Sequence, residues 1–290
     1  MKRLKQPLTI TVANGKGGVG KSTIIRFLSY NLALKGYKTL VVDEDPQSNT
    51  TKTMLITKEN HEEKEHYQIN KTLMAGVRDG DLKPLITPII DNLDMIPSHM
   101  DFKNLPTFLA KKYGIAESID KNYHQIELKK VSFMRDLLEP IKQDYDFILI
   151  DTPPTTSVYT RSAVYASDYV ILAFQTQSDS YDGALQFLEN DMSDLIENFD
   201  ADTDIIGVLP NQFTYHGAID ETVLADAVEK FGQQNIFEHI IPFAKRIQSA
   251  PRLGIRKDTY WDKKLFKDVI DPLTEDFLNR VEKVGGFEDE

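Results

Sequence analysis

The sequence predicts an α/β fold, a doubly wound and mostly parallel sheet with helices on both faces. Two patterns predict it: short apolar runs recur along the chain, and helical stretches separate them. The length of 290 residues, of which 41% are hydrophobic, is enough for a sizeable core. The expected strands, in chain order, are 8–13, 39–43, 93–97, 147–151, 169–174, 205–209 and 236–241.

The segments between these strands are expected to be helical or solvated. A glycine-rich turn precedes a helix at 21–34, which Gly36 ends as a left-handed cap. Residues 58–68 are almost entirely polar and indicate a solvated loop or an exposed helix. Helical sequence fills 101–140, and an amphipathic helix at 272–284 is expected to pack on the body, with the last four residues frayed. No repeat or linker marks a second domain, so the whole 290-residue chain is expected to form one.

The composition excludes several classes of site. The chain has no cysteine, which excludes disulfides, thiolate catalysis, iron–sulfur clusters and cysteine-ligated zinc. Its six histidines show no metal-ligand spacing. No run of 18 apolar residues is present, and the basic N-terminus is not followed by a signal-peptide core, so a cytoplasmic location without membrane attachment is expected.

The charge is unevenly distributed. The net charge is −11, yet the segment 240–267 holds eight basic residues against two acidic ones. Such asymmetry predicts a binding face, with solvated helix-face charges as the alternative. The eight residues are Lys245, Arg246, Arg252, Arg256, Lys257, Lys263, Lys264 and Lys267.

Residues 15–22 fit the pattern GxxxxGK[ST] between an expected strand and an expected helix. Glycines let backbone N–H groups converge on phosphate oxygens, and the helix N-terminus adds its positive dipole. Lys21 then offers a charge to the β- and γ-phosphates, and Ser22 a hydroxyl to Mg²⁺. The expected nucleotide-contacting residues are Gly15, Lys16, Gly17, Gly18, Val19, Gly20, Lys21, Ser22 and Thr23.

The second lysine of this loop, Lys16, gives the KGGVGKST form, which resembles the deviant Walker A of the ParA/MinD superfamily. In that family the first lysine crosses a dimer interface to the partner's nucleotide. The resemblance therefore implies a P-loop NTPase fold and ATP sandwiched between two subunits. The alternative is a solvated loop lysine.

Residues 41–51, VVDEDPQSNTT, resemble the family's VDxDPQxNxT segment. The resemblance implies that Asp45 orients the attacking water and that Asp43 lies near the P-loop and the metal. Glu44 stands where the family usually has an apolar residue.

Two further segments take part in the resemblance. DFILIDTPP at 146–154 has the form of a Walker B strand, with Asp151 beside Ser22 in the Mg²⁺ shell. Asn211, after the strand 205–209, corresponds to the family's adenine-reading asparagine. Pro242 and Phe243 lie in a segment similar to the family's IPR…SEAP motif, with Phe243 in place of the arginine, and are expected to close over the base.

Together these motifs imply a ParA-type partition ATPase of the small form without an N-terminal helix-turn-helix domain. The expected cofactors are ATP and Mg²⁺, with slow basal hydrolysis. The expected partners are a second copy of the chain, non-specific double-stranded DNA and a centromere-binding adaptor protein, with nucleoid association in the ATP state.

Two alternatives remain on the same fold. A MinD-like switch on a membrane or protein scaffold calls for a basic amphipathic C-terminal helix, whereas this chain ends in the acidic VEKVGGFEDE. A metabolic phosphotransferase would not need Lys16 or a basic C-terminal cluster, although fold alone does not exclude it.

Overall fold

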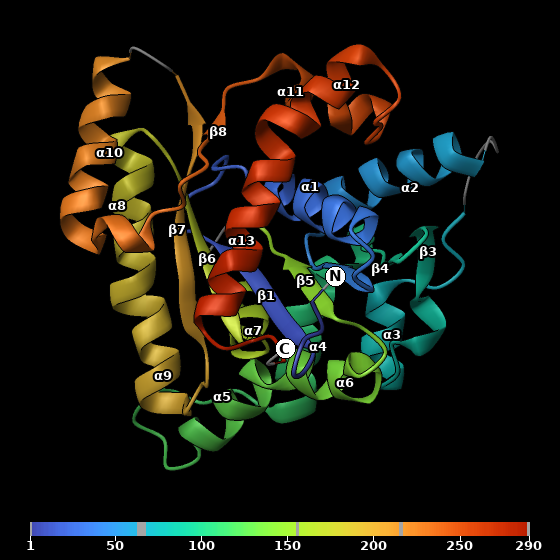
Figure 1. Cartoon of the computed structure of the whole chain (residues 1–290). Coiled ribbons are helices and arrows are strands. Elements are labelled where there is room, and N and C mark those ends of the chain that lie inside the picture. Colours follow the sequence, from blue (N-terminus) through green and yellow to red (C-terminus); the bar gives the residue numbers. More distant parts are fainter. Residues whose placement is uncertain (1, 63–67, 155–156, 215–216, 289–290) are drawn as a thin grey trace.

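The computed structural model describes residues 2–62, 68–154, 157–214 and 217–288 (Figure 1). A sheet in the order β3-β4-β2-β5-β1-β6-β7-β8 runs through the molecule, and within the described residues every neighbouring pair is parallel except β3 with β4. The strands are β1 (Leu8–Ala13), β2 (Thr39–Asp43), β3 (Thr87–Ile90), β4 (Leu93–Ile96), β5 (Phe147–Asp151), β6 (Tyr169–Gln175), β7 (Asp204–Phe213) and β8 (Ile241–Pro242). The doubly wound α/β prediction is confirmed.

Helices cover both faces of this sheet because successive strand residues point to opposite sides. Residues such as Ile10 and Leu149 pack under one helical layer, and Ile148 and Leu172 under the other. The first layer contains α1 (Lys21–Leu34), α2 (Asn49–Glu62), α11 (Lys245–Leu253), α12 (Tyr260–Leu265), a π-helical turn (Phe266–Ile270) and α13 (Asp271–Lys283) (Figure 1). The second contains α3 (Leu73–Asp79), α4 (Leu105–Tyr113), α5 (Tyr123–Val131), α6 (Phe133–Lys142), α7 (Val158–Tyr165), α8 (Ser178–Gln186), α9 (Ser193–Phe199) and α10 (Ala218–Phe231).

The phosphate-loop half of the chain matches the predicted boundaries closely, whereas one strand prediction is wrong. The segment 236–241 is not a strand: Ile236 makes an isolated bridge to Val208, and β8 begins only at Ile241. The backbone N–H groups of Glu238 and His239 donate instead to the buried carboxylate of Asp276 on α13. This carboxylate takes the bonds that a neighbouring strand would accept, so the segment leaves the sheet.

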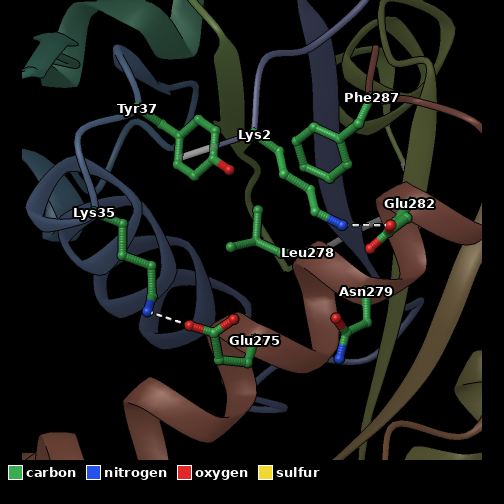
Figure 2. Close-up of a pocket in the computed structure, with 8 residues that line it drawn as sticks. All are labelled: Lys2, Lys35, Tyr37, Glu275, Leu278, Asn279, Glu282 and Phe287. Carbon is green, nitrogen blue, oxygen red and sulfur yellow. Dashed lines mark hydrogen bonds and ion pairs between the residues drawn. The ribbon is translucent and has the colours of Figure 1, made fainter. Parts of the chain in front are cut away.

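Helix α13 packs against the body beside both ends of the described chain (Figure 2). Lys35 pairs with Glu275 and Lys2 with Glu282, above a cavity of 380 Å³ whose apolar lining includes Phe287. Phe287 is buried and pairs with Leu4, and the N–H of Glu288 donates to the Arg3 carbonyl. Fraying at residues 287 and 288 is therefore a wrong prediction, and residues 289 and 290 lie outside the described chain.

Helix α2 covers part of the polar segment 58–68. It continues to Glu62, and the side chain of Lys58 is buried where it pairs with Glu62. Residues 63–67 lie outside the described chain. Among the helices within the described ranges, none combines the length and apolar character needed to cross a membrane.

Candidate nucleotide-binding site

The candidate site lies where the central parallel strands end. The loop 14–20 follows β1 and leads into α1, with Gly18 at φ 81° and Gly20 at φ 91°. A Cβ on Gly20 would lie 1.9 Å from Nδ2 of Asn211, so the left-handed backbone and the close approach both require glycine there. The amide of Asn211 donates to the Val19 carbonyl (2.7 Å) and holds the loop from β7.

Lys21 is buried under this loop. Its Nζ lies 3.4 Å from the carbonyl oxygen of Asn14 and 3.3 Å from that of Lys16. Burial lowers the pKa of Lys21, and the carboxylates of Asp151 and Asp45 act in the opposite direction. The ammonium group is thus fixed inside the loop that the sequence assigns to phosphates.

Ser22 and Asp151 lie together, as the resemblance implied. The Ser22 hydroxyl donates to Oδ1 of Asp151 (3.1 Å), and the Thr50 hydroxyl donates to Oδ2 (2.6 Å). Burial raises the pKa of Asp151, while the bonds from Thr50 and Ser22 lower it. A hydroxyl at the start of α1 that faces a carboxylate provides oxygen ligands of the kind that suit a hard cation such as Mg²⁺. Within the described residues no cluster of three or more acidic or imidazole side chains forms a separate metal cage.

Asp43 and Asp45 play different structural parts. Asp43 is fully buried and accepts bonds from the N–H (2.8 Å) and hydroxyl (2.7 Å) of Thr51 and from the N–H of Asp45 (3.1 Å). Burial, with Asp151 nearby, raises the pKa of Asp43. Asp45 accepts from the N–H of Gln47 (2.9 Å) and lines the open cleft. Asp43 therefore organises the turn after β2, and Asp45 is the carboxylate that faces the cleft.

A cleft of about 490 Å³ opens above these groups. Its volume falls in the range of small-molecule sites, and its floor is the phosphate loop. The lining residues are Gly18, Val19, Gly20, Lys21, Ser22, Thr23, Arg26, Asp45, Asn49, Thr152, Pro154, Gln212 and Pro251.

The expected adenine-contacting residues are not among those that line this cleft. Both ends of the Asn211 amide are engaged, since Nδ2 bonds to Val19 and Oδ1 accepts from the N–H of Gln212. Phe243 is 55% exposed, and neither it nor Pro242 lines the cleft. Gln212 and Pro251 lie there instead. Asn211 is buried near the end of β7, where its amide satisfies the loop backbone. The assignment of Asn211, Pro242 and Phe243 to the base stays a prediction.

Three residues that the sequence analysis missed support the loop. Gln175 and Gln212, at the ends of β6 and β7, both donate to the Gly18 carbonyl (2.9 and 3.0 Å). Arg26 lies one helical turn after Ser22, donates to its carbonyl oxygen (2.8 Å) and reaches the Thr53 hydroxyl (2.7 Å). The i, i+4 spacing of Ser22 and Arg26 was the available signal, because it places both on one helix face.

Lys16, unlike the buried Lys21, is exposed to solvent. Its N–H donates to Oδ1 of Asn14 (2.7 Å), and a Cβ on Gly183 would lie 2.4 Å from its Cγ. Gly183 on α8 thus leaves room for the stem of Lys16, whose charge faces outward.

Glu44 is a buried acid beside this site. It is fully buried, and within the described residues neither carboxyl oxygen has a hydrogen-bond partner. The nearby Ser162 hydroxyl donates to the Tyr159 carbonyl (3.0 Å). Burial, with the charge of Asp43 beside it, raises the pKa of Glu44 well above its usual value. Burial in this environment disfavours the charged form of the carboxyl.

The basic cluster of the C-terminal region is partly neutralised inside the molecule. Arg246 pairs with Asp262 (2.6 Å), Lys257 with Asp271 (3.6 Å) and Lys264 with Asp268 (2.6 Å). The remaining members, Lys245, Arg252, Arg256, Lys263 and Lys267, form no ion pair with the described part of the chain. The face is therefore less positive than the sequence count indicates.

Comparison with known proteins agrees with a P-loop NTPase fold. Residues 8–205 match the family model described as AAA domain. The chromosome partitioning protein ParA of Myxococcus xanthus is 27% identical over 248 residues, which cover 84% of this chain and 78% of that protein.

Two solved structures share the fold. A substituted form of McdA from Cyanothece, in complex with ATP, has a TM-score of 0.75 at 20% identity and covers 98% of this chain and 99% of its own. Cobyrinic acid a,c-diamide synthase from Mycobacterium smegmatis, with ADP and magnesium, has a TM-score of 0.70 at 20% identity, with coverage of 97% and 98%. With the family match spanning more than half of the chain, the protein belongs to the AAA-domain family of P-loop NTPases, as a ParA-type partition ATPase.

Proposed function

We propose that this protein is an ATP-gated dimeric switch for plasmid or chromosome partition. In the ATP state the dimer binds DNA non-specifically, and a centromere-binding adaptor protein triggers hydrolysis and release. The protein would act in the cytoplasm, associated with the nucleoid while ATP is bound. The observation that carries the proposal is the division of the two loop lysines: Lys21 is buried against the loop carbonyls, and Lys16 is exposed.

This difference between Lys21 and Lys16 supports an active site shared by two subunits. Lys21 is placed to neutralise phosphate charge in its own subunit, and it has no freedom to reach elsewhere. An exposed Lys16 can reach the nucleotide of a facing subunit, where a second positive charge offsets the charge of the transferring phosphoryl group. The dimer then depends on ATP, because ATP is the group that both lysines bind.

The remaining residues of the chemistry lie around the cleft. Ser22 and Asp151 would hold Mg²⁺, which supplies charge neutralisation of the phosphates when bound. The loop residues from Gly15 to Thr23 would bind the phosphates through their N–H groups. Asp45 lines the cleft and is proposed to orient the attacking water, while Asp43 holds the turn that carries Asp45. Gln212 and Pro251 are the cleft residues available to the base.

The DNA face is proposed to lie on α11, α12, the segment between them and the π-helical turn Phe266–Ile270 that follows. Its charges are expected to contact phosphates, so that binding falls steeply with salt and shows little sequence preference. Five of the eight basic residues form no ion pair with the described part of the chain and are the principal candidates: Lys245, Arg252, Arg256, Lys263 and Lys267.

The test is binding to random-sequence duplex DNA with Mg²⁺-ATP, with ADP and without nucleotide, at two salt concentrations. Salt-sensitive binding that requires ATP is the expected result. Intact ATP binding with no DNA binding in any state would overturn the partition switch. That result would favour the alternatives on this fold, a positioning role on a protein or membrane scaffold or a metabolic phosphotransferase.

A further inference from the structure

Helix α2 is buried largely through threonines. Thr50, Thr51, Thr53 and Thr57 are all buried, and each hydroxyl bonds to a group outside the helix. A buried hydroxyl without a partner costs free energy, so these bonds fix α2 in direction as well as position. The helix is therefore tied to its surroundings at several points along its length.

The first turn of α2 is held by the carboxylates of the candidate site. Thr50 donates to Oδ2 of Asp151, while Ser22 donates to Oδ1 of the same carboxylate. Thr51 donates to Asp43 through both its N–H and its hydroxyl. Ser22 and Thr50 therefore bond to the same carboxylate. A cation bound between Ser22 and Asp151 would also change the bond that Thr50 makes to this carboxylate. The amino end of α2 thus responds to the state of the site.

Arg26 makes a second connection, in the middle of the helix. Its guanidinium is buried and joins the Ser22 carbonyl oxygen on α1 to the Thr53 hydroxyl on α2 (2.8 and 2.7 Å). A planar guanidinium with bonds on both sides is a stiff link between two helices. Movement of the first turn of α1 is therefore passed to α2 directly.

The far end of α2 is clamped to the backbone that leaves α11. The N–H of Ile255 donates to the Thr57 hydroxyl (2.8 Å), and the Asn60 amide donates to the Leu253 carbonyl oxygen (2.8 Å). Gly254 between them has φ 72°, and a Cβ there would lie 2.9 Å from the Thr57 backbone nitrogen. This close approach leaves no side chain between α2 and the segment.

The clamped segment continues into the basic face. Arg246 on α11 bonds to Asp262 on α12 (2.6 Å), so the two short helices are connected. Trp261, the chain's only tryptophan, lies beside Asp262 and is 65% exposed. A displacement of the segment 253–255 would therefore reach α12 and the surroundings of this indole.

We propose that α2 couples the nucleotide site to the α11–α12 region, with Thr57 and Asn60 as its positioning residues. The inference rests on the proposed function, since it specifies how nucleotide regulates the basic face. At 1.5 Å per residue, the helix spans roughly 15 Å between Thr50 and Asn60. Its two ends bond to different functional regions, which is the physical requirement for such coupling.

The test uses Trp261 fluorescence in the full chain, titrated with Mg²⁺-ATP without DNA. The wild type is expected to show a change of emission at saturation. Thr57→Val should lose most of that change while its ATP affinity stays within about twofold, and Thr57→Ser, which keeps the hydroxyl, should restore it. In the DNA assay, Thr57→Val should reduce the ratio of affinities with and without ATP by about fivefold, as expected for loss of the bond from the Ile255 N–H.

Control variants distinguish a loss of coupling from a loss of folding. The Thr57 hydroxyl also donates to the Thr53 carbonyl oxygen within α2 (2.8 Å). Thr222→Val on α10 removes the equivalent bond within a helix, to the Ala218 carbonyl oxygen (2.9 Å), and should leave the signal intact. If Thr57→Val does not fold, Asn60→Ala, at an exposed position, removes only the bond to Leu253 and should also reduce the signal. An unchanged wild-type emission, or a full signal in Thr57→Val or Asn60→Ala, overturns the coupling. Absence of DNA binding in every state would contradict the proposed function and leave this fluorescence result standing.

Discussion

The phosphate end of the cleft and the C-terminal basic region are held in opposite ways. In the loop 14–20, buried side chains such as Asn211 and Lys21 bond to backbone carbonyl oxygens. In α11 and α12, exposed charges dominate, and several are paired with nearby acids. The first region is rigid before nucleotide arrives, which suits electrostatic preorganisation. The second can change its surroundings at small cost, which suits a face that is switched.

The largest expected effect tests the rigidity of the loop. Gly20→Ala adds a Cβ that meets Asn211 Nδ2 at 1.9 Å, on a backbone with φ 91°. Gly18 has a similar φ of 81° but no atom within 4 Å of its Cβ position. We expect Gly20→Ala to lower the free energy of unfolding by about 4 kcal/mol and Gly18→Ala by about 1 kcal/mol. Urea denaturation without nucleotide measures both, and equal losses would contradict a loop clamped by Asn211.

The next effect concerns the buried lysine. Lys21→Ala removes the charge fixed inside the loop, and ATP affinity should fall by about 100-fold. Lys38 is an exposed lysine directly before β2, and Lys38→Ala is the matched control with an unchanged affinity. Isothermal titration with Mg²⁺-ATP measures the two. A loss of less than about threefold in Lys21→Ala would contradict the assignment of the cleft.

A third effect concerns Glu44, whose folded pKa is raised well above 4.5. As the pH rises through that value, the unfolded chain releases the proton and the folded chain keeps it. The free energy of unfolding then falls with rising pH until the folded pKa is reached. Relative to Glu44→Gln, the wild type should therefore lose free energy of unfolding as the pH rises over the window above 4.5. Parallel stability curves in urea over this window would show that Glu44 is ionised in the folded protein.

The smallest expected effect separates two arginines of the basic region. Arg252 is exposed without an ion pair to the described residues, so Arg252→Ala should weaken ATP-dependent DNA binding by about threefold and lower the salt slope by about 1. Arg246 holds the buried Asp262, so Arg246→Ala should mainly lower the free energy of unfolding, by about 1 kcal/mol. Anisotropy with labelled duplex and urea denaturation distinguish them. Equal effects on DNA binding would mean that both arginines contact phosphates.

The contrast between the phosphate loop and the C-terminal basic region also explains which features could be predicted from the sequence. The strands β1, β2 and β5 and helix α1 were predicted with their observed ends, and Ser22 lies beside Asp151 as the resemblance implied. These features depend on continuous local patterns: a buried strand, a glycine turn and a polar residue at the strand end. Such patterns fix geometry because the carboxyl ends of parallel strands meet at one edge.

The remainder depends on contacts between distant segments. The ion pair of Arg246 with Asp262 and the bond from Glu238 to Asp276 join residues 16 and 38 positions apart, and no local pattern predicts them. The orientation of the Asn211 amide toward Val19 is likewise a property of packing. The short antiparallel β3 was missed because its four residues include a proline and lie at the sheet edge.

The ATP-dependent dimer is tested most directly by sedimentation velocity on the wild type and Lys16→Ala, each with Mg²⁺-ATP, with ADP and without nucleotide. The wild type should sediment as a dimer only with ATP. Lys16→Ala should remain a monomer in every state while its ATP affinity changes little, because Lys21 supplies the contact within the subunit. A Lys16→Ala variant that dimerises normally with ATP would contradict the shared active site.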